Sequence, residues 1–117
     1  MGVPMEKKRV IWFSLNAKYS HTSLAIRYLQ AACGEGQLLE LTINDYLPDI
    51  LGRIYECRPD ILGIACYIWN IEMVKALLPL LRKTMPHLVL FCGGPEVSYG
   101  TADFLRQYPM VDYVIRG

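Results

Sequence analysis

The stretch Leu88–Glu96 reads LVLFCGGPE, an apolar run that ends in two glycines and a proline. A short apolar run that stops at turn residues is typical of a strand buried on both faces of a parallel sheet. Gly93 and Gly94 let the backbone turn with no Cβ in the way. We therefore expect a central strand with a flat tip at its carboxyl end, which is where ligands bind in open α/β sheets.

Strand-like and helix-like segments alternate on either side of this stretch. Apolar runs predict further strands at 9–15, 38–43, 61–68 and 111–115. Apolar residues at helical spacing predict helices over about 20–33, from a cap at Asn44 or Asp45 to Pro59, from a cap at Asn70 to Pro86, and over about 101–107. Pro79 is expected to kink the third helix. The inner face of the second helix is expected to hold Ile50, Leu51, Ile54 and Tyr55.

This alternation predicts parallel strands with helices on both faces of the sheet. We expect one α/β domain over residues 1–117, a three-layer, Rossmann-like (flavodoxin-like) fold with a five-stranded parallel sheet in the order 2-1-3-4-5. In that order the first and third strands are neighbours whose following helices lie on opposite faces, so a ligand crevice opens at their carboxyl ends. The loops 16–21, 66–70 and 93–99 are expected to frame it.

Composition narrows the function. The chain has 117 residues, is 53% hydrophobic and has a net charge of +1, which favours a packed core and gives no electrostatic reason to bind nucleic acid or an anionic membrane. No apolar run approaches a membrane span, and residues 1–8 lack the apolar region of a signal peptide. The cysteines at positions 33, 57, 66 and 92 have no zinc spacing. Free thiols and a cytoplasmic location are expected.

Missing motifs exclude several classes of α/β protein. No Gly-x-Gly-x-x-Gly follows the first strand and no P-loop is present, which argues against a dinucleotide or triphosphate site. A response-regulator receiver needs acidic residues after the first strand and an Asp ending the third, but residues 16–18 read NAK and residues 66–68 read CYI. A flavin stays open, because Ser20, Thr22 and Ser23 weakly resemble a phosphate loop.

Four stretches together resemble one known family. Residues 16–29, 59–70, 93–96 and 111–117 resemble, in order and spacing, the N-terminal domain of cobalamin-dependent radical S-adenosylmethionine (SAM) proteins. The resemblance implies that cobalamin is the cofactor. It also implies a missing C-terminal radical SAM barrel, the partner domain, whose Cys-x-x-x-Cys-x-x-Cys motif holds a 4Fe-4S cluster and SAM. This chain has no such motif, so we expect an excised domain without catalytic residues of its own, from a parent enzyme that transfers a methyl group, oxidises or cyclises.

The resemblance also implies the residues around the corrin. A large flat ring needs a surface from which few side chains project, and the two glycines would supply such a surface. The candidate cofactor-binding residues are Asn16, Ala17, Tyr19, Ser20, His21, Cys66, Tyr67, Trp69, Gly93, Gly94, Pro95 and Glu96. Cys66 stands where carrier domains place a Ser against the nucleotide base, or it packs in the core. Tyr67 and Trp69 wall the corrin, face the barrel or pack within their loop.

His21 is the candidate lower axial ligand of cobalt. Corrinoid carriers such as methionine synthase have Asp-x-His-x-x-Gly after the first strand, and the corresponding residues here are Tyr19, His21 and Leu24. The Asp that would orient the imidazole is therefore replaced. A histidine at the start of a helix, with no metal, is the alternative reading of His21.

Other functions remain open. Because Tyr19 and Leu24 depart from the carrier pattern, the alternative is a cofactor-free interaction or scaffold domain. A flavodoxin-like flavin binder is a further alternative. The substrate of the parent enzyme is not predicted, because its contacts are expected in the missing barrel.

Overall fold

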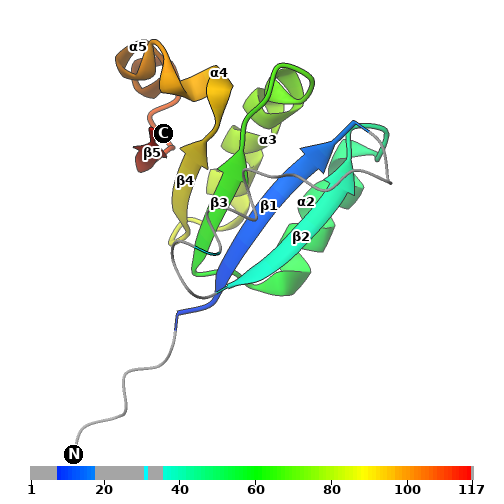
Figure 1. Cartoon of the computed structure of the whole chain (residues 1–117). Helices are drawn as coiled ribbons and strands as arrows, with labels where there is room; N and C mark the ends of the chain where they lie inside the picture. Colours follow the sequence, from blue (N-terminus) through cyan, green and yellow to red (C-terminus); the bar gives the residue numbers. More distant parts are fainter. Residues whose placement is uncertain (1–7, 18–30, 32–35, 117) are drawn as a thin grey trace, which may run out of the picture.

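The computed structural model in Figure 1 describes residues 8–17, 31 and 36–116. The strands are β1 (Val10–Asn16), β2 (Gln37–Thr42), β3 (Ile61–Ala65), β4 (Val89–Gly93) and β5 (Tyr113–Ile115). The helices are α2 (Leu47–Cys57), α3 (Ile71–Thr84), α4 (Pro95–Ser98) and α5 (Thr101–Gln107). The predicted helix over about 20–33 lies outside the described residues, apart from residue 31.

The five strands form one parallel sheet in the order β2-β1-β3-β4-β5. The predicted flavodoxin-like order is therefore confirmed. Ser14 of β1 pairs with Ala65 of β3, and Ala65 pairs with Gly93 of β4. Because all strands run in the same direction, their carboxyl ends meet along one edge, at the top of Figure 1. We call this edge, where Asn16, Ala65 and Gly93 end their strands, the carboxyl edge.

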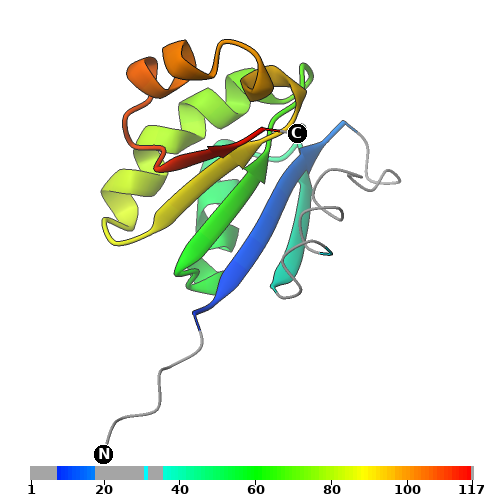
Figure 2. The ribbon, with the colours of Figure 1, turned by 60° about the vertical axis from the view of Figure 1, so that its left-hand side comes forward.

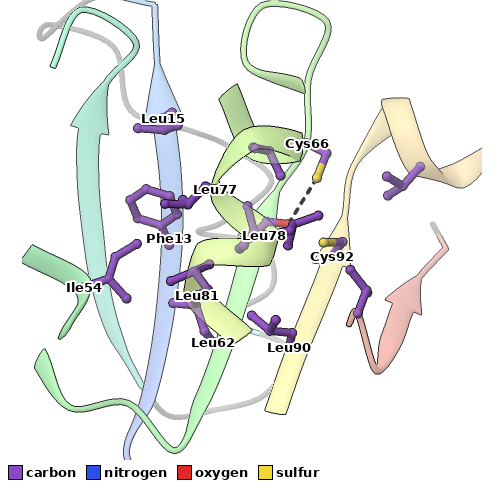
Figure 3. Packing of buried hydrophobic residues seen from close by; sticks show 14 of the residues in the cluster. Phe13, Leu15, Ile54, Leu62, Cys66, Leu77, Leu78, Leu81, Leu90 and Cys92 are labelled. Carbon is purple, nitrogen blue, oxygen red and sulfur yellow. Dashed lines mark hydrogen bonds between the residues drawn. The ribbon is translucent and has the colours of Figure 1, made fainter. Parts of the chain in front are cut away.

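The main core lies between the sheet and helices α2 and α3, which cover the same face in Figures 1 and 2. Alternate residues of β1 point into this core, because side chains along a strand alternate between faces. Figure 3 shows how the side chains of α3 interdigitate with those of the strands. The largest fully buried side chains are Ile11, Phe13, Leu15, Ile50, Ile54, Leu62, Ile64, Leu77, Leu78, Leu81 and Leu90.

The opposite side of the sheet, which we call the second face, has a smaller apolar cluster of Val10, Trp12 and Ala65. The Trp12 ring packs directly over β3 at Gly63, where a Cβ would come within 2.3 Å of two ring carbons. Only glycine leaves room for the indole at this position. The second face is therefore filled near the middle of the sheet by one large ring.

The structure moves several predicted strand limits. β3 ends at Ala65 rather than Ile68. The Tyr67 N–H bonds to the Asn70 side chain and no longer to a neighbouring strand. β4 covers Val89–Gly93 and so reaches past the apolar run 88–91. β5 begins at Tyr113 rather than residue 111. The predicted loop after β4 contains the short helix α4, which starts at a proline.

Helix α2 differs from its prediction in two respects. It begins after Tyr46, and neither Asn44 nor Asp45 caps it. The Asp45 carboxylate instead accepts a hydrogen bond from the Thr42 N–H at 2.8 Å, which closes the turn after β2. The predicted inward position of Tyr55 is wrong, because the side chain is 55% exposed. Only a narrow stripe of this helix reaches the core.

Helix α3 continues through Pro79 to Thr84. Pro79 is exposed, so the backbone bond that its ring removes is lost on the solvent side of the helix and does not end it. Its buried residues include Val74, Leu77 and Leu78. No helix among the described residues is long and apolar enough to cross a membrane.

Arg82, in the last turn of α3, ties three parts of the chain together at the edge opposite the carboxyl edge. Its guanidinium donates to the backbone oxygens of Pro86 (3.0 Å), Leu88 (2.5 Å) and Met110 (2.7 Å) and to the Asp112 carboxylate (3.0 Å). A planar fork can serve several acceptors at once in a way that an ammonium group cannot. Arg82 therefore fixes where β4 and β5 start.

We expect Arg82→Ala to lower the free energy of unfolding by roughly 2–3 kcal/mol, because it leaves the two partly buried acceptors, the Leu88 and Met110 oxygens, without this donor. Arg82→Lys should recover only part of this loss. Urea denaturation followed by circular dichroism measures both. The matched control is Arg106→Ala, which removes an exposed ion pair with Asp103 and should change stability by less than about 0.5 kcal/mol. Equal effects of the two alanine variants would contradict this role of Arg82.

Candidate functional site

The carboxyl edge brings together residues that lie far apart in the sequence. Asn16 ends β1, Cys66 follows β3 and Gly93 ends β4, and these strands are consecutive neighbours in the sheet. The strand order changes direction between β1 and β3, the place where open α/β sheets bind ligands. The three predicted loops therefore start from one edge, as the sequence analysis required of a common site.

The Asn70 side chain joins the ends of β1 and β3. Its Nδ2 donates to the backbone oxygens of Leu15 (3.1 Å) and Ala65 (3.0 Å), and its Oδ1 accepts from the Tyr67 N–H (2.8 Å). Asn70 is 1% exposed, so these bonds form away from water. Asn70 is the N-cap residue of α3, as the sequence predicted. Its side chain, however, makes no cap hydrogen bond, because its amide bonds to the Leu15 and Ala65 oxygens and to the Tyr67 N–H.

Trp69 and Tyr67 form an aromatic pair over this junction. Their rings are stacked with centroids 4.3 Å apart and planes 8° apart. The Trp69 Nε1 donates to the Leu15 oxygen at 3.2 Å, so this oxygen accepts hydrogen bonds from both Trp69 and Asn70. Tyr67 packs against the cluster on the second face, whereas Trp69 is 46% exposed. Part of the indole is therefore exposed to solvent beside the place where the strand order changes direction between β1 and β3.

The double glycine has a structural role within the chain itself. Gly94 has φ +106°, and a Cβ there would come within 2.5 Å of the Cys66 backbone oxygen. The Cys66 N–H donates to the Gly93 oxygen at 2.7 Å, and the Glu96 N–H donates to the Cys66 oxygen at 3.3 Å. Gly94 thus lets the turn after β4 close on the end of β3. This contact explains Gly94 without a ligand.

Cys66 points into the main core instead of toward the exposed edge. It is fully buried, and Figure 3 shows its sulfur facing that of Cys92 on β4. The hydrogen bond with the Cys66 thiol raises the pKa of the Cys92 thiol well above its ordinary value, and burial and repulsion between the two groups add to this shift. Cys66 thus follows the second of its two predictions, a packed core residue.

Several residues of the carboxyl edge are open to solvent. Ala17, Pro95 and Glu96 are exposed, as the predicted site requires. Asn16, by contrast, is buried at 5% exposure and accepts a hydrogen bond from the Ser14 hydroxyl at 2.9 Å. Large apolar side chains surround them: Ile68 is 78%, Trp69 46% and Tyr99 86% exposed. Exposed apolar groups of this size on neighbouring loops indicate a binding surface.

Tyr19, Ser20 and His21 lie outside the described residues, so their predicted roles stay predictions. Sequence reasoning assigned no structural role at the strand ends to Asn70 and did not single out Glu40 of β2, whose Oε1 is buried without a hydrogen-bond partner. An Asn shortly after an apolar run is compatible with a helix cap, a turn or a bond between two strand ends. A charged residue in an expected strand gives no sign of how deeply its side chain is buried. Within the described ranges, no three His, Cys, Asp or Glu side chains gather closely enough to hold a metal ion.

Comparisons with known proteins agree on one family. The sequence model described as "B12 binding domain" matches residues 13–117. A 2-(S-pantetheinyl)-carbapenam-3-carboxylate methyltransferase of Streptantibioticus cattleyicolor is 32% identical over 59 residues, or 50% of the chain. The cobalamin-dependent radical SAM methyltransferase TokK of Streptomyces tokunonensis is 30% identical over 60 residues, or 51% of the chain. Each match spans only 9% of the relative's own length.

Solved structures share the fold at lower sequence identity. The cobalamin-dependent SAM radical enzyme OxsB, with aqua-cobalamin and SAM bound, superposes with a TM-score of 0.72 at 16% identity, covering 92% of this chain and 17% of that one. A cobalamin-binding protein from Desulfitobacterium hafniense gives 0.64 at 15% identity, covering 92% and 53%. A CheY-like protein from Pseudomonas aeruginosa gives 0.63, at 16% identity and covering 92% and 87%, so the architecture extends beyond cobalamin proteins.

We expect Asn70→Ala to lower the free energy of unfolding by roughly 2–3 kcal/mol, because the Ala65 oxygen and the Tyr67 N–H lose their side-chain partner and the Leu15 oxygen keeps only Trp69. Asn70→Asp should be at least as damaging, since a carboxylate cannot donate to the Leu15 and Ala65 oxygens. Chemical denaturation measures both, and the exposed Asn44→Ala serves as control. If Asn70→Asp were as stable as the wild type, the assigned donor role of Nδ2 would be wrong.

The raised pKa of Cys92 leads to a prediction about reactivity. The thiolate is the reactive form, so Cys92 should react with iodoacetamide at pH 8 at least roughly tenfold more slowly than the half-buried Cys57, and Cys66 should react slowly because it is fully buried. Mass spectrometry of peptides after timed labelling measures each rate. Labelling in urea, where all thiols are exposed, provides the control. Equal native rates at Cys57 and Cys92 would contradict the burial of this pair.

Proposed function

The chain belongs to the B12 binding domain family, and from this premise we propose that it binds cobalamin at the carboxyl edge of its sheet. The observation that supports this location most directly is the change of strand order between β1 and β3. It places the loops after β1, β3 and β4 at one edge, and those loops hold the residues that the sequence predicted for the cofactor.

The described residues fit a large, flat, amide-bearing ring. The exposed side chains of Ile68, Trp69 and Tyr99 offer apolar contact area on two neighbouring loops. Pro95 and Glu96 are exposed beside them, and the short turn at Gly93 and Gly94 keeps side chains away from the end of β4. In this proposal, these residues contact the corrin, while Asn16 and Ala17 contact it from the end of β1.

We assign the described residues supporting rather than chemical roles. Asn70 holds the ends of β1 and β3 at a fixed separation, and the Trp69 bond to Leu15 fixes the indole beside them. When bound, cobalamin supplies a methyl group for transfer or takes part in an oxidation or a ring closure. The chain contributes binding, orientation and exclusion of water on one side of the ring.

The proposal extends to a larger protein. We infer that the chain acts as one domain of a cobalamin-dependent radical SAM enzyme, whose separate barrel would hold SAM and a 4Fe-4S cluster. The two curated relatives support this inference, because both are methyltransferases matched over only 9% of their length, and one is itself described as a cobalamin-dependent radical SAM enzyme. In this proposal His21 would ligate cobalt, and its sequence neighbours Tyr19 and Ser20 would also contact the cofactor.

The test is retention of hydroxocobalamin. The purified chain is mixed with hydroxocobalamin, free cofactor is removed by gel filtration, and the visible spectrum is recorded; we expect about one cobalamin per chain. Tyr99→Ala, which removes an exposed ring at the carboxyl edge, should weaken binding by roughly three- to tenfold, as one aromatic contact does. Tyr55→Ala removes an exposed ring from α2 and should leave affinity unchanged.

Two outcomes would count against the proposal. If the wild-type chain retained no cobalamin, the cofactor-free interaction domain would become the better account of this fold. If Tyr55→Ala weakened binding as much as Tyr99→Ala, the cofactor would not lie at the carboxyl edge. A His21→Ala variant, with the exposed His87→Ala as control, should change the band shape of bound cobalamin only if His21 ligates cobalt.

A further inference from the structure

Glu40 of β2 has a feature that the fold does not explain. Within the described part of the chain, its Oε1 is the buried side-chain oxygen for which no hydrogen-bond donor is present. A buried acceptor without a partner costs free energy, because it loses its water and gains nothing in return. Leu residues precede and follow it at positions 38, 39 and 41, so an apolar residue would suit this strand better.

The sheet register gives the position of this carboxylate. Glu40 pairs with Ser14 of β1, and residues paired in a parallel sheet point to the same face. Leu38, two residues earlier, packs against the cluster on the second face, so Glu40 points to that face as well. The strand ends two residues later at Thr42, which places Glu40 about 7 Å behind the carboxyl edge.

The residues that follow Glu40 across the sheet in its register have small side chains. Ser14 pairs in turn with Ala65, and Ala65 with Gly93, so the side chains across β1, β3 and β4 in this register are small. The Ser14 hydroxyl donates its proton to Asn16. Glu40 therefore lies on β2, next to the place where the strand order changes direction between β1 and β3. It sits behind the loops of the proposed cobalamin site.

We propose that Glu40 is a cobalamin-contacting residue, whose carboxylate accepts a hydrogen bond from a hydroxyl or amide N–H group of the bound cofactor. The inference rests on the proposed function. Cobalamin has both kinds of donor, primary amides around the corrin and a ribose hydroxyl in its nucleotide tail. A hydrogen bond that satisfies an otherwise unpartnered buried acceptor has a measurable effect on affinity.

The experiment compares Glu40→Leu and Glu40→Gln with the wild-type 117-residue chain. Dissociation constants for hydroxocobalamin come from spectroscopic titration, and thermal midpoints come from the cofactor-free protein. We expect Glu40→Leu to weaken cobalamin binding by roughly tenfold or more. The same change should raise the thermal midpoint of the cofactor-free chain by a few degrees, since it removes an unpartnered buried oxygen. Glu40→Gln keeps one acceptor and should weaken binding less.

The matched control is Glu56→Leu, on the exposed side of α2, which should change neither affinity nor midpoint appreciably. Titration with cobinamide, which lacks the nucleotide tail, separates the two donors. A loss for cobalamin alone assigns the ribose hydroxyl, and an equal loss for both assigns a corrin amide.

The possible failures are distinguishable. If wild-type chain binds hydroxocobalamin and Glu40→Leu binds it equally well, the role of Glu40 is wrong while the proposed function stands. If the wild type binds no cobalamin, the proposed function fails first. A thermal midpoint that falls in Glu40→Leu would show that the carboxylate already has a partner in the cofactor-free chain, which would also overturn the inference.

Discussion

The carboxamide of Asn70 is the interaction on which the geometry of the carboxyl edge depends. One side chain bonds to two backbone oxygens and one backbone N–H at the ends of neighbouring strands, and it shares the Leu15 oxygen with the Trp69 indole. Because the oxygens belong to β1 and β3, this side chain fixes the two strand ends at the place where the sheet changes direction. The loops that start there are therefore anchored at fixed positions, which a binding surface made of loops needs.

The sheet was predictable because its signals are local and repeated. Apolar runs ending in Gly, Pro or Asn marked the strands, and the alternation with helices allowed few topologies other than the observed order. The single side chains were less predictable, because their roles depend on contacts between distant segments. Tyr55 continues an apolar pattern yet lies beyond the narrow stripe of α2 that reaches the core, and Asn70 satisfies every rule for a cap while bonding elsewhere.

The double glycine shows how a correct location can have a different physical cause. The sequence placed Gly93 and Gly94 at a strand tip as a platform for a ligand, and the tip is where it was expected. Gly94, however, is already required by the backbone of Cys66. The presence of Gly94 therefore indicates only that the turn is tight. The support for cobalamin binding comes from the family match, the strand order and the exposed apolar side chains.

The network around Arg82 lies at the end of the sheet away from the proposed site, where the Arg9 N–H also bonds to the Asp60 carboxylate at 2.7 Å. Much of the polar cross-linking that sets the strand starts is thus separated from the loops of the proposed site. Such an arrangement allows those loops to drift in sequence, and so to suit a new cofactor or a new neighbouring domain, while the scaffold keeps its shape. A fold of this kind can change function during evolution without losing the ability to fold.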